Sequence, residues 1–356
     1  MQNKLFIPGP TEVKEDVLKQ LSKPMISHRG KEFSALYSEI TQKLQKLLCT
    51  ENPCFVSTSS AIGVMEACVR NCVRKKSLNL VCGAFSKKWA EIVKACNKEC
   101  DIIKVEDGQA IKPEMVDEKL KTGEYDSVFL THNETSTGVM NPLEEIAEVV
   151  KKYPDIIFMV DCVSSMAGVK IEVDRLGIDI ALASVQKCFA LPPGIAVFSC
   201  SKKAIERSKE LTNKGYYFDF VEFLKYHEKS QTISTPSIPH MYALNYQLDK
   251  ILTQEGAENR FTRHKEMADF VRKWTIKNGF ELFAEKGYES NTVTCVKNTK
   301  DINVSELIKT IKEKYQLEFG NGYGELKEKT LRIAHMGDMT LEEVKDLLEK
   351  IEKETK

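Results

Sequence analysis

The sequence has no excess of either charge, because 52 acidic residues balance 52 basic ones. Such a chain sets up no long-range field that would gather nucleic acid or an anionic membrane surface. It contains no run of the ~18 apolar residues that a membrane-spanning helix requires, and no apolar segment follows a basic leader at its start. We therefore expect a cytoplasmic protein that acts on small molecules, with neither nucleic acid nor a membrane as a partner.

Metal-binding cysteine patterns are also missing. The chain has 11 cysteines, an odd number spread along its length, which suits reduced thiols better than a disulfide framework. Cys68 and Cys72, like Cys96 and Cys100, are four residues apart and would share one face of a helix. No CxxC pair or nearby histidine completes a tetrahedral set of ligands. We therefore expect no metal site and interpret these cysteines as small hydrophobic core residues.

What the chain does contain is an alternation of short apolar runs and amphipathic stretches. Apolar runs that lie between helices and lack strict alternation are typical of a largely parallel sheet covered on both faces. They predict an α/β fold. The expected strands lie near 54–57, 78–82, 127–131, 156–163, 178–184 and 195–200, with helices beginning near Ala61 and Ser86.

The pattern changes after about Leu252, where a long charged helical stretch begins. Helical and strand-like segments then follow one another, the helices near 304–315 and 341–351 and the strands near 292–296 and 331–334. A chain of 356 residues is also longer than one simple core usually needs. We predict three parts: an N-terminal arm over 1–17, a large domain over 18–253 and a small α+β domain over 254–356.

One lysine follows a predicted strand in an unusual setting. Lys187 stands in a segment that ends in Pro-Pro-Gly, which predicts an irregular turn at the end of the strand. Ligands of open parallel sheets bind at such strand ends. A lysine held there can lose its proton by desolvation and attack a carbonyl carbon. The alternative is an ordinary exposed lysine.

Two further strand ends carry polar residues. Asp161 directly follows an apolar run, and a carboxylate there is what a protonated pyridine nitrogen requires; a structural or helix-capping aspartate would look the same. The turn Ser-Thr-Ser-Ser-Ala-Ile-Gly at 57–63 leads from a strand into a helix. Backbone N–H groups at the positive end of a helix favour a phosphate, although helix capping alone would also explain the serines.

Together these segments resemble the class V aminotransferases of pyridoxal-phosphate fold type I, most closely the alanine–glyoxylate and serine–pyruvate aminotransferase branch. That fold has a large domain with a mostly parallel sheet flanked by helices and a smaller C-terminal α+β domain. The resemblance covers nearly the whole chain. It rests on Pro-Gly-Pro-Thr-Glu-Val at 8–13, Met-Ile-Ser-His-Arg at 25–29, Thr-His-Asn-Glu-Thr-Ser-Thr-Gly at 131–138, Ser-Val-Gln-Lys at 184–187 and Leu-Arg-Ile-Ala at 331–334.

The resemblance implies that pyridoxal 5′-phosphate is the cofactor and that Lys187 and Asp161 are catalytic. Lys187 would hold the cofactor as a Schiff base and then move the proton between the substrate α-carbon and the cofactor. Asp161 would pair with the pyridinium N–H. Arg332, unless it is a surface ion-pair residue, would bind the substrate carboxylate by a two-pronged hydrogen bond that lysine cannot make. Gly9 is placed with Arg332 among the substrate-binding residues.

The same resemblance assigns the other contacts to the cofactor. Phe85 would stack on the ring, unless it is simply a core residue, with Val163 on the opposite face and Thr135 near the ring hydroxyl. The phosphate would be bound by Ser60, Ala61, Ile62 and Gln186. Thr235 would reach the phosphate of the partner subunit, which implies a homodimer with shared active sites.

The sequence departs from that branch at two places. Ala61 and Ile62 stand where the phosphate loop of the branch has Gly and His or Thr, so Ile62 offers no side-chain donor. Thr232 replaces an aromatic residue three positions before Thr235, and Gln231 or Thr232 is the candidate for its phosphate contact.

Four other features near the predicted site have open roles. His28 and Arg29 are interpreted as part of an arm that is locked by hydrogen bonds, with a place near the active site as the alternative. The Asn-Gly-Tyr-Gly segment at 321–324 predicts either a gating loop or a simple turn. His335 is expected to lie near the site without being catalytic.

We predict the transfer of an amino group from a small amino acid, alanine or serine, to a 2-oxo acid, glyoxylate or pyruvate, by a ping-pong mechanism. The alternatives are a phosphoserine or aspartate aminotransferase, a cysteine desulfurase-like lyase and a non-catalytic cofactor-binding protein. A desulfurase needs a nucleophilic cysteine near the substrate carboxylate, and the chain has none between Glu318 and Arg332. Intact Lys187, Asp161 and Arg332 argue against a non-catalytic protein.

Overall fold

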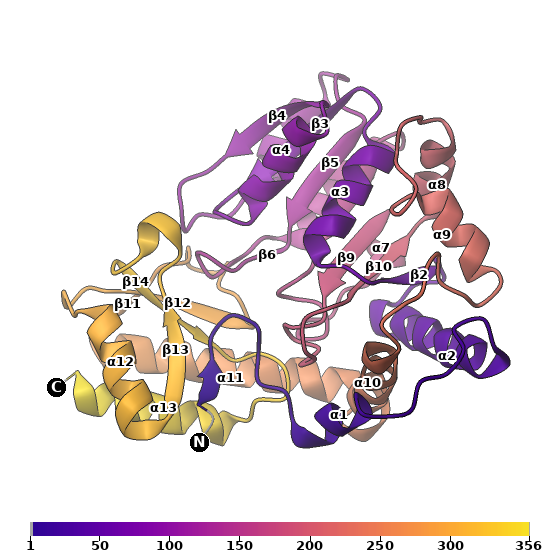
Figure 1. Ribbon diagram of the computed structural model, residues 1–356. Helices are drawn as coiled ribbons and strands as arrows, with labels where there is room; N and C mark the ends of the chain where they lie inside the picture. Colours follow the sequence, from indigo (N-terminus) through magenta and orange to yellow (C-terminus); the bar gives the residue numbers. More distant parts are fainter. Residues whose placement is uncertain (1–2, 356) are drawn as a thin grey trace.

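The computed structural model describes residues 3–355, so the first two residues of the predicted N-terminal arm lie outside it. A larger unit is built on a seven-stranded sheet and a smaller one on a five-stranded sheet (Figure 1). The strands of the large sheet are β2 (Cys54–Ser57), β3 (Lys76–Val81), β4 (Glu99–Lys104), β5 (Ser127–Thr131), β8 (Ile157–Asp161), β9 (Ile180–Ser184) and β10 (Ala196–Cys200).

The large sheet has the order β2-β10-β9-β8-β5-β3-β4. β10 runs antiparallel to both of its neighbours, and all the other pairs are parallel. This confirms the predicted α/β fold with a largely parallel sheet. Sequence reasoning did not predict β4, because this edge strand is mostly exposed or half-buried and therefore has no continuous apolar run.

Helices cover both faces of the large sheet. Successive side chains of a strand point to opposite faces, so Phe129 of β5 stacks on Trp89 with ring centroids 4.4 Å apart, whereas Val128 and Leu130 join the core on the other side. The helices on the Phe129 face are α3 (Ala61–Cys72), α4 (Ser86–Ala95), α8 (Lys202–Lys209) and α9 (Phe220–His227). Those on the opposite face are α2 (Lys31–Leu48), α5 (Pro113–Leu120), α6 (Leu143–Val150), α7 (Val173–Leu176) and α10 (Ile238–Asp249).

The small sheet has the order β1-β13-β14-β12-β11 and its own apolar core. Its strands are β1 (Lys4–Phe6), β11 (Glu281–Leu282), β12 (Val293–Lys297), β13 (Leu317–Asn321) and β14 (Thr330–Ala334). Its core also takes in residues of α11 (Ala257–Lys277), α12 (Val304–Tyr315) and α13 (Leu341–Glu354). The shorter elements are α1 (Glu15–Gln20), β6 (Asn133–Glu134), β7 (Val139–Met140), η1 (Lys250–Gln254) and η2 (Gly324–Leu326).

Residues 4–6 of the predicted arm pair with a strand from the C-terminal part of the chain. β1 lies parallel to β13 in the small sheet, and α1 then packs against α10. The predicted boundary near residue 253 falls in the π-helical turn η1, between α10 and α11. The division of the chain into three parts at 17 and 253 stays a prediction.

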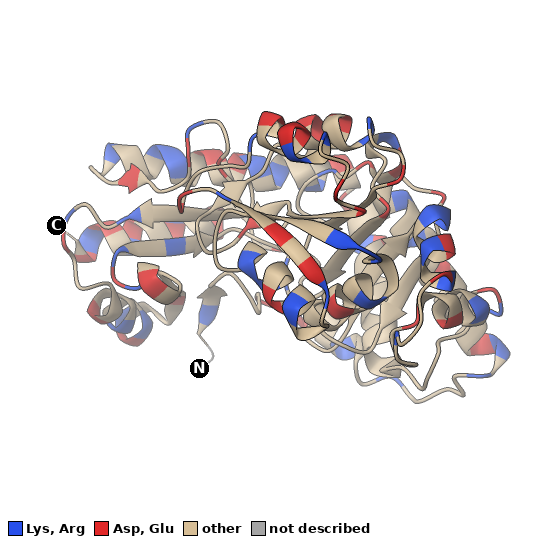
Figure 2. Cartoon of the chain, turned by 90° about the horizontal axis from the view of Figure 1, so that it is seen from above, with Lys and Arg blue, Asp and Glu red and all other residues tan. Residues whose placement is uncertain are grey.

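Most of the cysteines are buried, and the surface carries charges of both signs (Figure 2). All 11 cysteines are free and eight of them are buried, including Cys68 and Cys72, whereas Cys96 and Cys100 are half-buried. Residues 3–355 contain no group of three or more His, Cys, Asp or Glu side chains that could hold a metal ion. Within the same range, no helix combines the length and apolar character needed to cross a bilayer. Acidic and basic residues are interspersed along the outer helices (Figure 2).

Candidate active site

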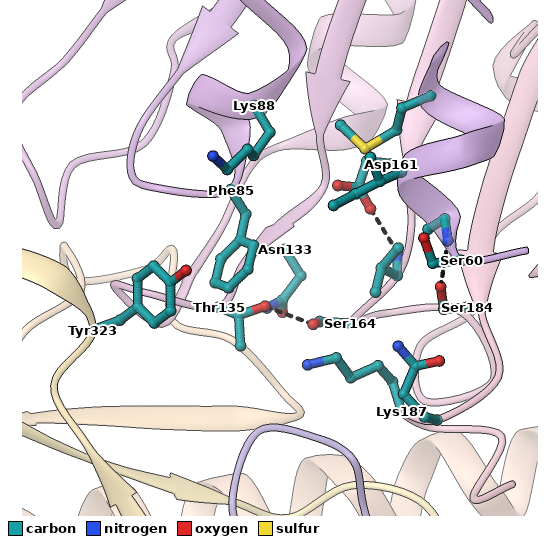
Figure 3. A pocket seen from close by; sticks show the side chains of 15 residues that line it. Ser60, Phe85, Lys88, Asn133, Thr135, Asp161, Ser164, Ser184, Lys187 and Tyr323 are labelled. Atoms are coloured by element: carbon teal, nitrogen blue, oxygen red, sulfur yellow. Dashed lines mark hydrogen bonds between the residues drawn. The ribbon is translucent and has the colours of Figure 1, made fainter. Parts of the chain in front are cut away.

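A cavity of about 260 Å³ lies where β5, β8 and β9 end and where α3 and α4 begin. Figure 3 shows its 15 lining residues, which come from segments far apart in the sequence. The structure brings nine of the predicted site residues together here: Ser60, Ala61, Ile62, Phe85, Thr135, Asp161, Val163, Gln186 and Lys187. Gly9, Thr235 and Arg332 are not among the lining residues and are described below.

Lys187 lies in the turn that follows β9. The segment from Pro8 to Thr11 passes next to it. Its Nζ donates a hydrogen bond to the main-chain oxygen of Pro8, and the Thr11 hydroxyl donates one to the main-chain oxygen of Lys187 at 3.0 Å. Burial, with a smaller contribution from the positive charge of Arg332, lowers the pKa of Lys187 to about 8. More of this amine is therefore neutral and nucleophilic near pH 7 than in an exposed lysine.

Gly9 is in direct contact with the Lys187 side chain. A Cβ atom at Gly9 would come within 2.6 Å of both Cδ and Nζ of Lys187, and the backbone φ of 105° also disfavours any other residue. The Lys187 amine thus occupies space that is open only because residue 9 has no side chain.

Asp161 ends β8 at the edge of the same cavity. Its side chain is only 6% exposed, and its Oδ1 accepts a hydrogen bond from the Val163 N–H at 2.8 Å. Burial raises the pKa of Asp161 to about 7, although the Val163 bond opposes this shift. A positively charged N–H group placed against this carboxylate would favour its ionised form.

Phe85 forms an aromatic wall of the cavity (Figure 3). A fully buried carboxylate, Glu134, fixes this segment, because it accepts hydrogen bonds from the N–H groups of Phe85 (3.1 Å) and Ser86 (2.8 Å) and from the Ser86 hydroxyl (2.8 Å). The Phe85 ring lies 5.0 Å from the ring of Tyr323, which belongs to the 321–324 loop of the small unit. Both units therefore contribute to this side of the site.

The start of α3 forms another side of the cavity. Ser60 is the N-cap residue, but its side chain makes no capping hydrogen bond. The Ala61 N–H donates to the Ser184 hydroxyl at 2.7 Å, so this main-chain donor, which the resemblance assigns to the phosphate, already has a protein partner. Ile62 is 53% exposed beside them. The positive end of a 12-residue helix at this place suits an anionic group.

Asn133 supplies a donor without a partner. Its side chain is 3% exposed, and its Nδ2 is buried with no hydrogen-bond acceptor among the described residues. An unpaired buried amide costs ~1–3 kcal/mol, so a ligand with an acceptor in this cavity would recover that energy. The cavity thus fits an aromatic aldehyde with a ring nitrogen and a phosphate, as in pyridoxal 5′-phosphate. It offers a nucleophilic amine, a carboxylate at a strand end, an aromatic side chain, an unpaired amide donor and the N-terminus of a helix.

Arg332 lies on β14 and contacts Thr135, which lines the cavity. It is 9% exposed; its Nε donates to the main-chain oxygen of Asn321 at 2.9 Å and its Nη1 to that of Thr135 at 3.3 Å. Its guanidinium carbon is 5.6 Å from the centre of the Tyr323 ring. The 321–324 loop thus holds Arg332 through Asn321 and covers it with Tyr323.

Of the features with open roles, His28, Arg29 and His335 do not line the cavity, whereas the 321–324 loop contributes Tyr323 to it. Arg29 donates to the main-chain oxygen of Thr232 at 2.8 Å and to the Gln231 side chain at 3.0 Å, so the 25–29 segment is tied to 231–235 as the hydrogen-bonded interpretation predicts. The exposed Thr235 lies 3.5 Å from His28 Nε2. His335 is buried, burial lowers its pKa to about 3, and its Nε2 lies 3.0 Å from the Thr294 hydroxyl.

Sequence reasoning gave no role to six of the lining residues. They are Met65, Lys88, Asn133, Ser164, Ser184 and Tyr323. Asn133 and Ser184 belong to the motifs at 131–138 and 184–187, and their place at strand ends was the available signal. Tyr323 belongs to the 321–324 segment, for which the sequence predicted only a gating loop or a turn. Ser164 was recognisable only by its position after Asp161, and its hydroxyl lies 2.6 Å from that of Thr135. Lys88 had no signal except its place one helical turn after Phe85.

Comparisons with known proteins agree with this geometry. The family model "Aminotransferase class-V" matches residues 5–348. An uncharacterised aminotransferase of Methanocaldococcus jannaschii is 42% identical over 338 residues, which cover 94% of this chain and 87% of the relative. Serine–glyoxylate aminotransferase of Arabidopsis thaliana is 28% identical, with 94% of this chain and 86% of the relative covered.

The crystal structure of an alanine–glyoxylate aminotransferase from Nostoc sp. has the same fold. It superposes with a TM-score of 0.93 at 28% sequence identity and covers 100% of this chain and 96% of its own. Since the family match extends over almost the whole length and the cavity has the side chains that the cofactor requires, the chain belongs to the class V aminotransferases, which are pyridoxal 5′-phosphate enzymes.

Proposed function

We propose that this aminotransferase moves the amino group of alanine or serine to glyoxylate or pyruvate by a ping-pong route. The observation that carries the proposal is that Lys187, Asp161 and Phe85 line the same cavity of about 260 Å³. The Arg332 guanidinium is bonded to Thr135, another lining residue. The relatives named serine–glyoxylate and alanine–glyoxylate aminotransferase support alanine or serine as the donor and glyoxylate as an acceptor.

In this proposal each wall of the cavity has one task toward the cofactor. Lys187 would bind the aldehyde carbon, Asp161 would pair with the ring N–H, and Phe85 and Val163 would enclose the ring. Thr135 would lie near the ring hydroxyl. The phosphate would be held at the start of α3, by the Ser60 hydroxyl, the main chain at Ala61 and Ile62, and the Gln186 amide. The Ala61 N–H would then exchange its bond to the Ser184 hydroxyl for one to the phosphate.

The substrate is oriented by Arg332 and the proton is moved by Lys187. The bound cofactor supplies an electron sink that acidifies the substrate α-carbon. The main-chain oxygens of Asn321 and Thr135 accept hydrogen bonds from Nε and Nη1 of Arg332. Nη2 and the second N–H of Nη1 therefore remain for a two-pronged bond with the substrate carboxylate. Gly9 leaves room for the Lys187 amine, which would take the proton from the substrate α-carbon and deliver it to the cofactor carbon that receives the amino group.

We further propose a homodimer in the cytoplasm whose sites are shared. Thr235 is exposed and lies outside the cavity of its own chain, which leaves it free to contact the phosphate of a partner subunit. Large apolar side chains are also exposed around this part of the surface: Met25 (61%), Ile62 (53%), Tyr216 (64%) and Tyr217 (38%). Burial of such residues between two subunits would stabilise a dimer.

The desulfurase alternative lacks its nucleophile. A cysteine near the substrate would be required, and none of the described residues that line the cavity is a cysteine. Cys188 is adjacent to Lys187, but it is buried and burial raises its thiol pKa to about 11. The aminotransferase reaction therefore has the better support.

The pKa of Lys187 predicts how cofactor uptake depends on pH. The neutral amine is the reacting form, so the rate of covalent uptake by the apoprotein should rise with pH through a midpoint near 8 and then level off. An ordinary lysine with a pKa of 10.5 would keep the rate rising to a much higher pH. Stopped-flow absorbance after mixing with pyridoxal 5′-phosphate measures this profile, and a midpoint above about 10 would contradict the assigned environment of Lys187.

A single-turnover panel tests the proposed function. The holoenzyme is mixed with L-alanine, L-serine or L-cysteine, and the absorbance of the bound cofactor is followed. Alanine and serine should convert it to the amine form within one turnover, and glyoxylate or pyruvate should restore the starting spectrum. If alanine and serine leave the spectrum unchanged while cysteine releases sulfide, the lyase replaces the aminotransferase.

A further inference from the structure

The cavity contains a cation that the proposed reaction leaves unused. Lys88 lies in the first turn of α4 and lines the same cavity as Lys187 and Asp161. In Figure 3 its ammonium group points to the side of Phe85 and Tyr323, away from Ser60, where the cofactor phosphate is proposed to bind. Lys88 is therefore placed toward the substrate and not toward the phosphate.

The ammonium group of Lys88 is charged but only loosely engaged. Its hydrogen bond to Glu91, at 2.6 Å, raises its pKa, so it carries a full positive charge at neutral pH. Both side chains of this pair are 45% exposed and lie three residues apart on one helix. Exposed pairs of this kind contribute little, so an anion in the cavity can compete with Glu91 for the ammonium.

The positive groups of the site exceed what the small donor needs. Arg332 is sufficient for the α-carboxylate, and Lys187 holds the cofactor. Tyr323 lies next to both Arg332 and Lys88. Its ring lies 5.6 Å from the Arg332 guanidinium carbon, and its hydroxyl is close enough to Lys88 to contribute electrostatically to the pKa of that lysine. A substrate bound to Arg332 would thus extend its side chain past Tyr323 and Phe85 toward Lys88.

We infer that Lys88 is a specificity residue that binds the anionic side-chain group, a carboxylate or a phosphate, of an acidic amino donor. The inference rests on the proposed function and widens its donor class from alanine and serine to amino acids such as aspartate and phosphoserine. The chemical step is unchanged: the donor gives up its amino group and becomes the 2-oxo acid, and the acceptor oxo acid becomes the amino acid. No further reactant is needed.

Lys88→Met tests this inference, and Lys87→Met is its matched control. Lys87 is the next residue on the same helix and also pairs with Glu91, at 3.9 Å, but it is 67% exposed and does not line the cavity. For each holoenzyme, kcat/KM of the half-reaction is measured with L-aspartate, L-phosphoserine and L-alanine. The ratio of the acidic donor to alanine should fall about tenfold in Lys88→Met, stay near the wild-type ratio in Lys87→Met, and recover in Lys88→Arg.

A binding measurement gives a result that does not depend on turnover. Succinate and propionate have no amino group, so calorimetric titration of the holoenzymes compares two carboxylates with one. The affinity for succinate relative to propionate should also fall about tenfold in Lys88→Met only. If the donor ratio and the succinate-to-propionate ratio are each the same in Lys88→Met and Lys87→Met, then Lys88 does not recognise the side chain of the donor. This conclusion holds even where alanine still reacts. If no amino acid reacts, the proposed function fails, and the succinate titration still decides the role of Lys88.

The two acidic donors distinguish the source of the anion. A loss confined to phosphoserine identifies a phosphate subsite, and a loss confined to aspartate identifies a carboxylate subsite. Either result supports the inference. Weaker binding of pyridoxal 5′-phosphate to Lys88→Met, with unchanged donor ratios, would instead place Lys88 at the cofactor and overturn it.

Discussion

Replacement of Lys187 by alanine should abolish covalent attachment of the cofactor and lower kcat of transamination by about 10⁴-fold. Proton transfer by a well-placed group contributes up to about 10⁴-fold by itself, and Lys187 is the only lysine besides Lys88 among the described residues that line the cavity. Borohydride reduction followed by peptide mass analysis should find the cofactor on Lys187 of the wild-type protein and no adduct on the variant.

The control for this variant is Lys87→Ala, which removes a lysine from the nearby surface of α4 without reaching the cavity. It should keep both the adduct and the absorbance of the bound cofactor. A reduced adduct at another lysine of Lys187→Ala, together with kcat within tenfold of wild type, would show that Lys187 is not the attachment site.

Asp161→Asn should lower kcat by about 10²–10³-fold, which is the typical effect of losing one preorganised electrostatic group. The amide has the size of the carboxylate, and its oxygen can keep the bond from the Val163 N–H. It cannot carry the negative charge that holds a ring N–H positive, so the cofactor withdraws electrons less strongly. The absorbance of the bound cofactor should shift for the same reason, which separates this effect from a loss of folded protein.

Asp179→Asn is the matched control for Asp161. Asp179 is a buried aspartate directly before β9, 4% exposed, that accepts a hydrogen bond from the Phe158 N–H at 2.9 Å and pairs with Lys203 outside the cavity. Its replacement should lower the free energy of unfolding and leave the cofactor spectrum of the folded protein as it is. Equal spectra and kcat values for the two variants would refute the assigned role of Asp161.

The large sheet was predictable from local pattern because its strands are buried on both faces. Continuous apolar runs predicted β5 with the bounds that the structure shows and the other inner strands to within a few residues. The same argument explains the omissions. β4 is an edge strand with charged, exposed residues, and β1 has three residues whose strand character depends on β13, more than 300 residues later in the chain.

The candidate site was predictable as far as its residues stand at strand ends. Lys187 and Asp161 each follow a buried strand of a parallel sheet, where ligands bind. Lys88 and Tyr323 could not be found in this way, because one belongs to an ordinary amphipathic helix and the other to a short loop of the small unit. Tertiary packing brings the Tyr323 ring within 5.0 Å of the Phe85 ring and so places Tyr323 in the cavity that Lys88 also lines.

The pattern of apolar residues and the residue types that follow each strand are local properties of the sequence. The sequence alone was therefore sufficient to predict the α/β architecture, the lysine and the aspartate at strand ends, and the family resemblance. The chemical state of those groups was decided by packing between distant segments. Pro8 and Gly9 enclose the Lys187 amine, Arg332 approaches it from the small unit, and burial lowers its pKa to about 8. Desolvation and charge proximity depend on distances in space, and such distances between remote segments exist only once both sheets have packed together.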